Sequence, residues 1–226
     1  MLLADLGLDP ASDAARETVA LVGRNCRWEY DDLPFFAGEV EPCINGRTVA
    51  VGAHLGADVG GIVRRLLDDQ LPDGGWNCWT ESGATVSSFD STINVVEGLL
   101  AWERATGSPA EVAVARRRGE EYLLARGLLR RRSDGAVIDD GWRVIHVPAY
   151  WCYDVLRGLD HLRASGREPD PRSGEAVEVI RAARRPDGTW AAEPHAGRPL
   201  IDLGPVANGI ATTRARRVLA WAGVAA

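Results

Sequence analysis

The stretch LLDDQLPDGGWNCWTESGATVSSFDSTINVVEGLLAWE, residues 66–103, decides the fold of this chain. It begins with the end of an apolar helical pattern and continues into the Asp-Gly-Gly-Trp turn at residues 73–76. The glycines let the backbone turn tightly while the indole packs back onto it. Ser87 and Ser88 have side chains preferred at a helix N-cap, and apolar residues then recur at helical spacing up to Trp102. The stretch therefore predicts a corner between two helices.

The composition of the 226-residue chain is that of a globular protein. Its hydrophobic share of 46% and charged share of 26% allow one substantial core, so we expect a single domain over residues 1–226. No apolar run approaches the ~20 residues that span a bilayer. The N-terminus shows no basic region followed by a signal-like core. We therefore expect a cytoplasmic protein without a transmembrane segment.

The charged residues exclude several classes of function. A net charge of -6 opposes binding to a phosphate backbone, so we expect no nucleic-acid partner. All 26 basic residues are arginines, which excludes a Schiff-base lysine, a pyridoxal-phosphate lysine and the lysine of a P-loop. The motifs HExxH and GxSxG are also absent.

Caps, stops and apolar periodicity predict about eight helices and almost no sheet. The first is expected over about residues 10–22, with Asp9 as its N-cap and Gly23 as its stop. The other expected helices cover about residues 48–55, 58–70, 88–103, 108–126, 149–164, 170–185 and 206–221. Residues 25–45 are expected to be irregular.

Four tryptophans fall one per long loop, at Trp28, Trp76, Trp142 and Trp190. Each follows one helical segment and precedes another, and three of the loops also carry Asp-Gly. This pattern indicates an internal repeat of four helical hairpins, of the kind that stack into a curved layer. We expect each indole to plug its own corner.

Several segments resemble α/α toroid proteins. Residues 70–76 resemble the QW repeat of squalene-hopene cyclases and related triterpene cyclases, and residues 187–190 look like a degenerate second copy. Residues 150–162 are similar to inner-helix segments of protein prenyltransferase β subunits. The segments most similar to small bacterial squalene-cyclase-like proteins are 38–46, 73–78, 87–100 and 153–160. The resemblance implies an all-α fold, an α/α toroid forming a partial barrel of about four helical hairpins.

In such toroids the first turns of the inner helices line a cavity, which makes Asp90, Thr92, Asn94, Cys152 and Asp154 candidates. The resemblance implies a terpenoid cyclase-like enzyme that cyclises or isomerises a small, largely apolar or prenyl-like substrate. Asp90 and Asp154 would be the acid or base, since a carboxyl group in an apolar cavity has a raised pKa. Cys152, counted with the catalytic residues, and Asn94 would orient the substrate. Alternatively, both aspartates are helix-start acids favoured by the macrodipole.

The other substrate-binding candidates are aromatic or polar side chains near these positions. An aromatic wall could stabilise carbocations or bind a flat apolar ligand, although core packing explains most of these residues equally well. The candidates are Trp76, Trp79, Phe89, Tyr150, Trp151, His54, Glu39 and Glu41.

The cysteines offer a second kind of chemistry. They lack the density of a disulfide scaffold and show no Cys-x-x-Cys zinc signature. Cys43, Cys78 and Cys152 lie in or just after long loops, where they could converge on zinc or supply a nucleophile. Alternatively, they are small buried packing residues. A zinc-thiolate enzyme for hydrolysis or group transfer and a noncatalytic small-molecule-binding module are therefore the alternative functions.

The two ends of the predicted helical layer need a cover. Four hairpins form an arc whose ends expose apolar helix faces unless something covers them. Residues 26–42, with Trp28, Phe35 and Phe36, could dock there. Otherwise a second copy must do so, and a twofold dimer is the commonest solution. We expect either a monomer plugged by this segment or a homodimer.

Overall fold

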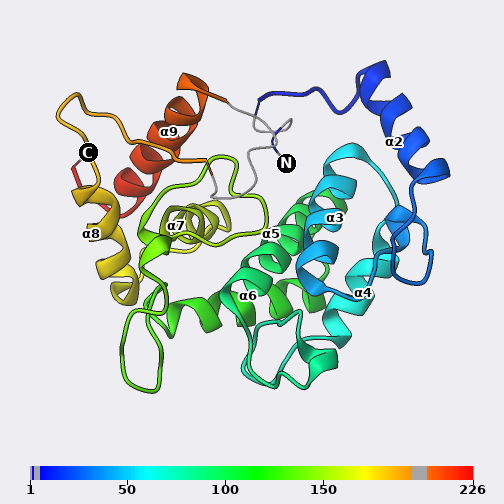
Figure 1. Cartoon of the computed structure of the whole chain (residues 1–226), viewed down its shortest axis with the longest axis horizontal. Coiled ribbons are helices and arrows are strands. Elements are labelled where there is room, and N and C mark those ends of the chain that lie inside the picture. Colours follow the sequence, from blue (N-terminus) through cyan, green and yellow to red (C-terminus); the bar gives the residue numbers. More distant parts are fainter. Residues whose placement is uncertain (1, 3–5, 195–202, 226) are drawn as a thin grey trace. The chain divides into compact units, whose positions relative to one another are not determined.

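The computed structural model describes residues 2, 6–194 and 203–225 (Figure 1). This part of the chain contains eight complete α-helices and no β-strand, which confirms the all-α prediction. The α-helices are α2 (Asp13–Asn25), α3 (Pro42–Leu55), α4 (Gly60–Asp68), α5 (Phe89–Thr106), α6 (Ala110–Leu124), α7 (Val155–Ala164), α8 (Gly174–Ala182) and α9 (Pro205–Trp221). The short 3-10 helices are η1 (Phe35–Ala37), η2 (Thr80–Ser82), η3 (Asp140–Arg143) and η4 (Pro171–Ser173). Among the described residues, no helix combines the length and apolar character that crossing a membrane requires.

The chain divides into two compact units, Met1–Glu121 and Tyr122–Ala226. In the first unit α3 and α5 form the most extensive helix–helix contact, and α4 packs on α3. In the second unit α7 packs on α8 and α9. The toroid arrangement and the single domain stay predictions.

The contact between α3 and α5 brings two backbones together. A Cβ atom at Gly46 would overlap the carbonyl group of Asn94, and one at Gly98 would overlap the carbonyl group of Gly46. Only glycine permits so close an approach. Helices α3 and α5 therefore form one tightly packed pair.

Two helix starts in the first unit differ from prediction. The N-cap of α2 is Ser12, whose hydroxyl accepts from the Ala15 amide, while Asp9 accepts from Ala11 in the turn before it. The helix also continues past Gly23 to Asn25. Helix α3 begins six residues earlier than predicted, at Pro42, a residue suited to the first helical position.

The start of α7 is six residues later than predicted. Tyr150 has a φ of 48°, in the left-handed region, which interrupts any helix there. Asp154 is the N-cap and accepts a hydrogen bond from the Arg157 amide at 2.8 Å. The predicted end at Ala164 is confirmed.

The Trp76 corner confirms the predicted turn between α4 and α5. The indole is fully buried and donates from Nε1 to the Leu66 carbonyl at 2.7 Å. The Trp76 amide donates to Oγ1 of Thr92, in the first turns of α5, at 3.1 Å. The Leu71 amide closes the turn by donating to the Gly75 carbonyl at 2.9 Å. Hydrogen bonds thus tie the corner to both flanking helices.

The Trp190 corner, between α8 and α9, repeats this arrangement. The buried indole donates from Nε1 to the Ile180 carbonyl at 2.7 Å, again ten residues earlier. Its amide donates to Oγ1 of Thr212 at 3.0 Å. The Arg185 amide closes the turn on the Thr189 carbonyl at 2.9 Å. The internal repeat is therefore visible in these two corners.

The other two tryptophans are only half-buried and lie in different surroundings. Trp28 stacks on Phe35 with ring centroids 4.7 Å apart, and Phe35 meets Phe36 edge to face at 5.2 Å. Helix η1, which carries both phenylalanines, packs on α2 and α4. Trp142 meets Tyr153 edge to face at 4.9 Å. These indoles do not plug corners of the Trp76 type.

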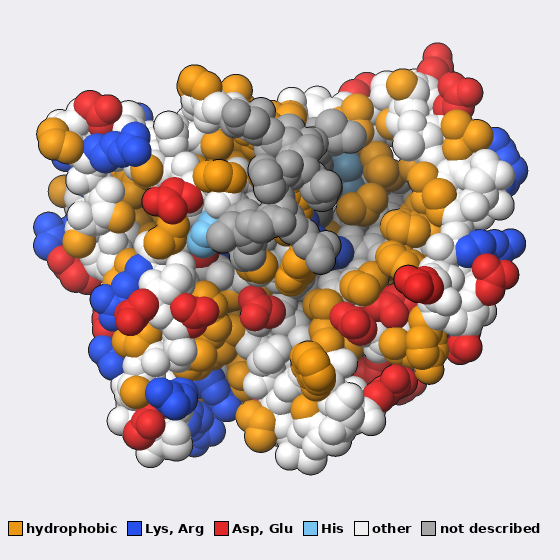
Figure 2. All heavy atoms as spheres, viewed as in Figure 1, with side chains coloured by type: hydrophobic (Ala, Val, Ile, Leu, Met, Phe, Trp, Pro, Cys, Tyr) orange, Lys and Arg blue, Asp and Glu red, His pale blue; other side chains and the backbone are white. Residues whose placement is uncertain are grey.

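The surface mixes charges of both signs with apolar side chains. On the face drawn in Figure 2, acidic side chains are interspersed with arginines and with apolar groups. Several of the apolar side chains on this face lie next to one another. Trp79 is the most exposed of the large ones among the described residues, at 71%.

Candidate functional site

Glu41, Cys43 and Cys78 form the one group of at least three potential metal ligands found among the described residues. One carboxylate oxygen and two sulfur atoms all lie within 4.8 Å of one another. All three residues are half-buried. The structure thus brings together two of the cysteines predicted as zinc ligands and adds Glu41, which the sequence placed among the substrate-binding residues.

Two structural elements position the two sulfurs. Cys43 lies in the first turn of α3, directly after Pro42. Cys78 follows the Trp76 corner by two residues. The Cys43 amide donates to Sγ of Cys78 at 3.4 Å. The Cys78 sulfur therefore lies at the N-terminus of α3. The partial positive charge at that end of a helix favours a thiolate.

Ser91, in the first turn of α5, also binds Cys78. Its hydroxyl donates to Sγ of Cys78 at 3.2 Å and accepts from the Cys78 amide at 3.1 Å. The Ser88 hydroxyl in turn donates to Oγ of Ser91 at 2.8 Å. The two hydroxyls therefore form a chain of donors that ends at the sulfur.

The two thiols have different electrostatic environments. The hydrogen bond donated by the Cys43 thiol lowers the pKa of Cys78, and the Ser91 hydroxyl and Cys43 amide add to this effect. The same hydrogen bond, together with burial, raises the pKa of Cys43. The Cys43 thiol also lies 3.5 Å from Oε2 of Glu41, as a donor. In this pair the Cys43 thiol is therefore the hydrogen-bond donor and the Cys78 sulfur is the acceptor.

Glu39 and Asn45 fix the loop that carries Glu41. The Asn45 side chain donates to the Glu39 carbonyl at 2.7 Å and accepts from the Glu39 amide at 2.8 Å. The Glu39 carboxylate accepts from the amides of Val40 at 2.9 Å and Glu41 at 3.0 Å. Burial raises the pKa of Glu39, although these amides oppose the shift. The Glu39 carboxylate thus stabilises the backbone of the loop to which it belongs.

Several predicted site residues of the first unit have structural partners. Thr92 and Trp76 bond each other in the corner, and Phe89 is buried. Asn94 is fully buried and donates to the Asp90 carbonyl at 2.7 Å, one turn back along α5. These contacts account for the burial of these residues without a ligand.

The remaining predicted residues of this unit are more accessible. Asp90 is half-buried in the first turn of α5, one residue before Ser91. Trp79 is largely exposed and directly follows Cys78. His54 is exposed in the last turn of α3, at the opposite end of the helix from Cys43. His54 is therefore not brought to the Glu41–Cys43–Cys78 cluster.

The predicted catalytic residues of the second unit lie around the start of α7. Asp154 is buried, and its carboxylate accepts from the amides of Arg157 at 2.8 Å and His146 at 3.2 Å. Burial raises its pKa, while these amides lower it. Cys152 is half-buried, and its carbonyl accepts from Nη1 of Arg157 at 2.7 Å. Asp154 has the geometry of a helix cap.

The two aromatic candidates of this unit are neighbours in the same turn. Tyr150 is half-buried and Trp151 is 42% exposed. Their ring centroids lie 6.1 Å apart at a tilted angle. Both rings remain partly accessible to a ligand.

Sequence reasoning missed two features of the first unit. Ser91 was overlooked because serine in a first helical turn resembles an ordinary cap, although the Ser-x-x-Ser spacing of Ser88 and Ser91 was a usable signal. Arg116 is buried between Glu103 and Glu120 and donates to both carboxylates. The four-residue spacing of Arg116 and Glu120 on one helix could have indicated part of this network.

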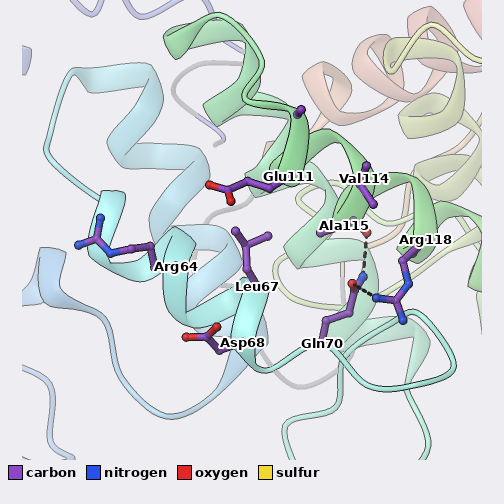
Figure 3. Close-up of a pocket in the computed structure, with 9 residues that line it drawn as sticks. Arg64, Leu67, Asp68, Gln70, Glu111, Val114, Ala115 and Arg118 are labelled. Carbon is purple, nitrogen blue, oxygen red and sulfur yellow. Dashed lines mark hydrogen bonds between the residues drawn. The ribbon is translucent and has the colours of Figure 1, made fainter.

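A groove of about 620 Å³ lies between α4 and α6 (Figure 3). Gln70 spans it, donating to the Ala115 carbonyl at 2.8 Å and accepting from Nη1 of Arg118 at 2.9 Å. Leu67 and Val114 contribute apolar surface. No residue predicted as a site residue lines this groove.

Comparisons with known protein families, with curated proteins and with solved structures found no match for this chain. The resemblance to squalene-cyclase-like proteins therefore rests on the sequence segments alone and stays a prediction.

Proposed function

We propose that Glu41, Cys43 and Cys78 bind a zinc ion and that the chain is a zinc-dependent enzyme for hydrolysis or group transfer. One observation carries this proposal, namely the convergence of one carboxylate oxygen and two sulfurs within 4.8 Å. The three residues come from the loop before α3, the first turn of α3 and the Trp76 corner. Their convergence is therefore a product of the tertiary fold.

The donor set suits zinc in type, number and spacing. Ligands at about 2.3 Å from a tetrahedral ion lie about 3.8 Å apart, so the observed separations need to shrink by no more than about 1 Å. Sulfur donors favour zinc over magnesium or calcium. Binding would also remove the Cys43 proton, as thiolate coordination requires. Three protein ligands leave the fourth position open, as in catalytic zinc sites.

The surrounding residues hold the ligands and supply a surface for the substrate. Zinc at this position would lower the pKa of a bound water to about 7 and polarise a carbonyl or phosphoryl oxygen. The Ser91 hydroxyl orients the Cys78 sulfur, and the loop held by Glu39 and Asn45 presents Glu41. The exposed Trp79 follows Cys78 and favours a small, largely apolar substrate. Free thiols of this kind fit the cytoplasmic location that the sequence predicts.

The terpenoid cyclase-like reaction at Asp90 and Asp154 stays a prediction. Both Asp154 oxygens already accept from backbone amides, which explains the buried carboxylate as a helix cap. No described contact gives this acid–base pair a feature comparable to the sulfur–carboxylate cluster. The zinc site is therefore the better supported function.

Elemental analysis of the purified full-length chain tests the proposal. After chelation and dialysis against zinc, we expect about one zinc per chain. Cys43→Ser and Cys78→Ser should lose the metal, and Glu41→Gln should hold it more weakly. Cys26→Ser is the matched control because Cys26 is exposed and outside the cluster. A wild-type chain that retains no zinc, or cysteine variants that retain as much as wild type, would overturn the proposal. Circular dichroism checks that each variant is folded.

Catalysis is tested separately from metal binding. An untargeted metabolite comparison between cells with wild-type protein and cells with Cys78→Ser should reveal an accumulated substrate. Identical metabolite profiles, with zinc bound in vitro, would instead indicate the noncatalytic small-molecule-binding module.

A further inference from the structure

We propose that Cys43 and Cys78 are also a peroxide-sensitive pair that closes into an intramolecular disulfide. Disulfide formation depends only on the two thiols. Its consequence, release of the metal, rests on the proposed zinc site, because a disulfide removes two of the three ligands.

The geometry places the two sulfurs within reach of each other. They lie within 4.8 Å, so a bond of about 2.05 Å needs an approach of at most about 3 Å. The Cys43 amide already contacts Sγ of Cys78 at 3.4 Å. Both residues are half-buried, which leaves a small oxidant a path to the sulfurs.

One cysteine of the pair lies on a tightly packed helix, and the other lies next to an exposed segment. Cys43 belongs to α3, which packs backbone to backbone on α5 through Gly46 and Gly98. Cys78 is followed by the surface segment 79–86, in which all residues but one are exposed, Trp79 among them. For the sulfurs to meet, the Cys78 side chain has to give up the hydrogen bond that it accepts from Ser91.

The oxidation is balanced with hydrogen peroxide as the oxidant. The Cys78 sulfur attacks one peroxide oxygen, the O–O bond breaks, and a sulfenic acid forms as hydroxide leaves. The Cys43 thiol gives up its proton to the released hydroxide, and its sulfur then attacks the Cys78 sulfur, so that the S–S bond forms, the S–O bond breaks and a second hydroxide leaves. A further proton converts this second hydroxide to water. The thiolates are oxidised by two electrons and the peroxide is reduced by two.

The test treats the full-length chain with hydrogen peroxide in two forms, zinc-loaded and chelator-treated. Non-reducing peptide mapping by mass spectrometry should show the Cys43 peptide cross-linked to the Cys78 peptide in both forms. Dithiothreitol should reverse the cross-link. In the zinc-loaded form, a chromogenic chelator should detect one zinc released for each cross-link.

Two variants sharpen the test. Cys43→Ser should form no cross-link and should leave a sulfenic acid on Cys78 that dimedone traps. Cys26→Ser should behave like wild type, because Cys26 lies outside the cluster. The wild-type peptide map is decisive by itself if Cys43→Ser fails to fold.

The contrary outcomes are distinct from failure of the zinc site. Cys43 and Cys78 recovered as free thiols while Cys26 is oxidised, or Cys78 converted directly to sulfinic acid, would overturn the disulfide. A cross-link in a chain that retains no zinc after dialysis against zinc would support the disulfide and overturn the proposed function instead.

Discussion

The Trp76 and Trp190 corners share one scaffold but carry different chemistry. In both, the indole N–H reaches a carbonyl ten residues earlier, and a threonine from the following helix binds the tryptophan amide. Two residues later, a side chain from the first turn of the next helix accepts the backbone amide. In the first corner this residue is Cys78 and the acceptor is Ser91, whereas in the second they are Ala192 and Asn208.

Ser91 and Asn208 occupy equivalent positions, but within the described part of the chain only one of them has a contact beyond the backbone. Asn208 only anchors the backbone, at 2.8 Å from the Ala192 amide. Ser91 anchors the backbone and also donates to a sulfur. The thiol therefore occupies a position that the second corner fills with alanine.

Removal of either indole should have the largest effect. Trp76→Ala and Trp190→Ala are each expected to lower the free energy of unfolding by about 3–5 kcal/mol, because each leaves a large cavity and an unpaired carbonyl. Urea denaturation followed by circular dichroism measures this loss. Trp→Phe at the same positions should be milder. A loss below about 1 kcal/mol at one position would break the equivalence of the corners.

The glycines of the two corners should differ in their tolerance. Gly74 has a φ of 99°, and a Cβ there would lie 2.8 Å from the Arg118 carbonyl oxygen. Gly188 has a φ of 79°, and its Cβ would lie 3.1 Å from the flexible guanidinium of Arg184. Gly74→Ala should therefore cost about 2–4 kcal/mol and Gly188→Ala about 1–2 kcal/mol in urea denaturation. Equal losses would show that the Arg118 backbone gives way.

Ser91→Ala and Asn208→Ala should distinguish the anchoring of the backbone amide from the effect on the pKa of Cys78. Each should lower the free energy of unfolding by about 1 kcal/mol, since each removes the acceptor of a backbone amide. Only Ser91→Ala should raise the pKa of Cys78, because it removes a donor to the thiolate. In chelator-treated protein this slows alkylation of Cys78 by iodoacetamide at neutral pH. An unchanged rate in Ser91→Ala would remove the distinction between the corners.

The smallest expected effect concerns the pH dependence of stability at Asp187, in the Trp190 corner. The Thr189 hydroxyl at 2.7 Å and amide at 2.9 Å lower the pKa of Asp187 below 3.8. Because the folded-state pKa is depressed, this contribution to stability is present above pH 3.8 and is lost as the pH falls through the folded-state pKa. The stability difference between wild type and Thr189→Val should therefore shrink on acidification. Thr213→Val, whose exposed hydroxyl binds the Gly209 carbonyl, should show no such trend.

Much of the helical fold could be predicted because local signals decide it. Ser88 caps α5 as its side chain indicates, and α9 begins within one residue of the expected position. The start of α7 could not be predicted, because apolar periodicity continues through Tyr150 while the backbone there is left-handed. The start of α3 was missed because Pro42 lies in a segment without periodicity.

The candidate site was harder to predict because its contacts are tertiary. Cys43 and Cys78 are 35 positions apart, and only the packing of α3 against α5 and the Trp76 corner brings them together. Cysteines near loops indicated possible ligands, but no spacing indicated which would meet. Glu41 was grouped with Glu39, although Glu39 binds its own loop and Glu41 contacts a thiol.

The backbone contact between α3 and α5 has a thermodynamic consequence for binding at their first turns. With Gly46 and Gly98 in contact with the facing backbone, neither helix can slide or rotate without separating from the other. Cys43 and Ser91 therefore keep their spacing whether or not anything is bound, and their ordering entropy is already lost on folding. Binding at this end should therefore cost little conformational entropy at these two residues. The residual entropy loss should come from the exposed segment after Cys78.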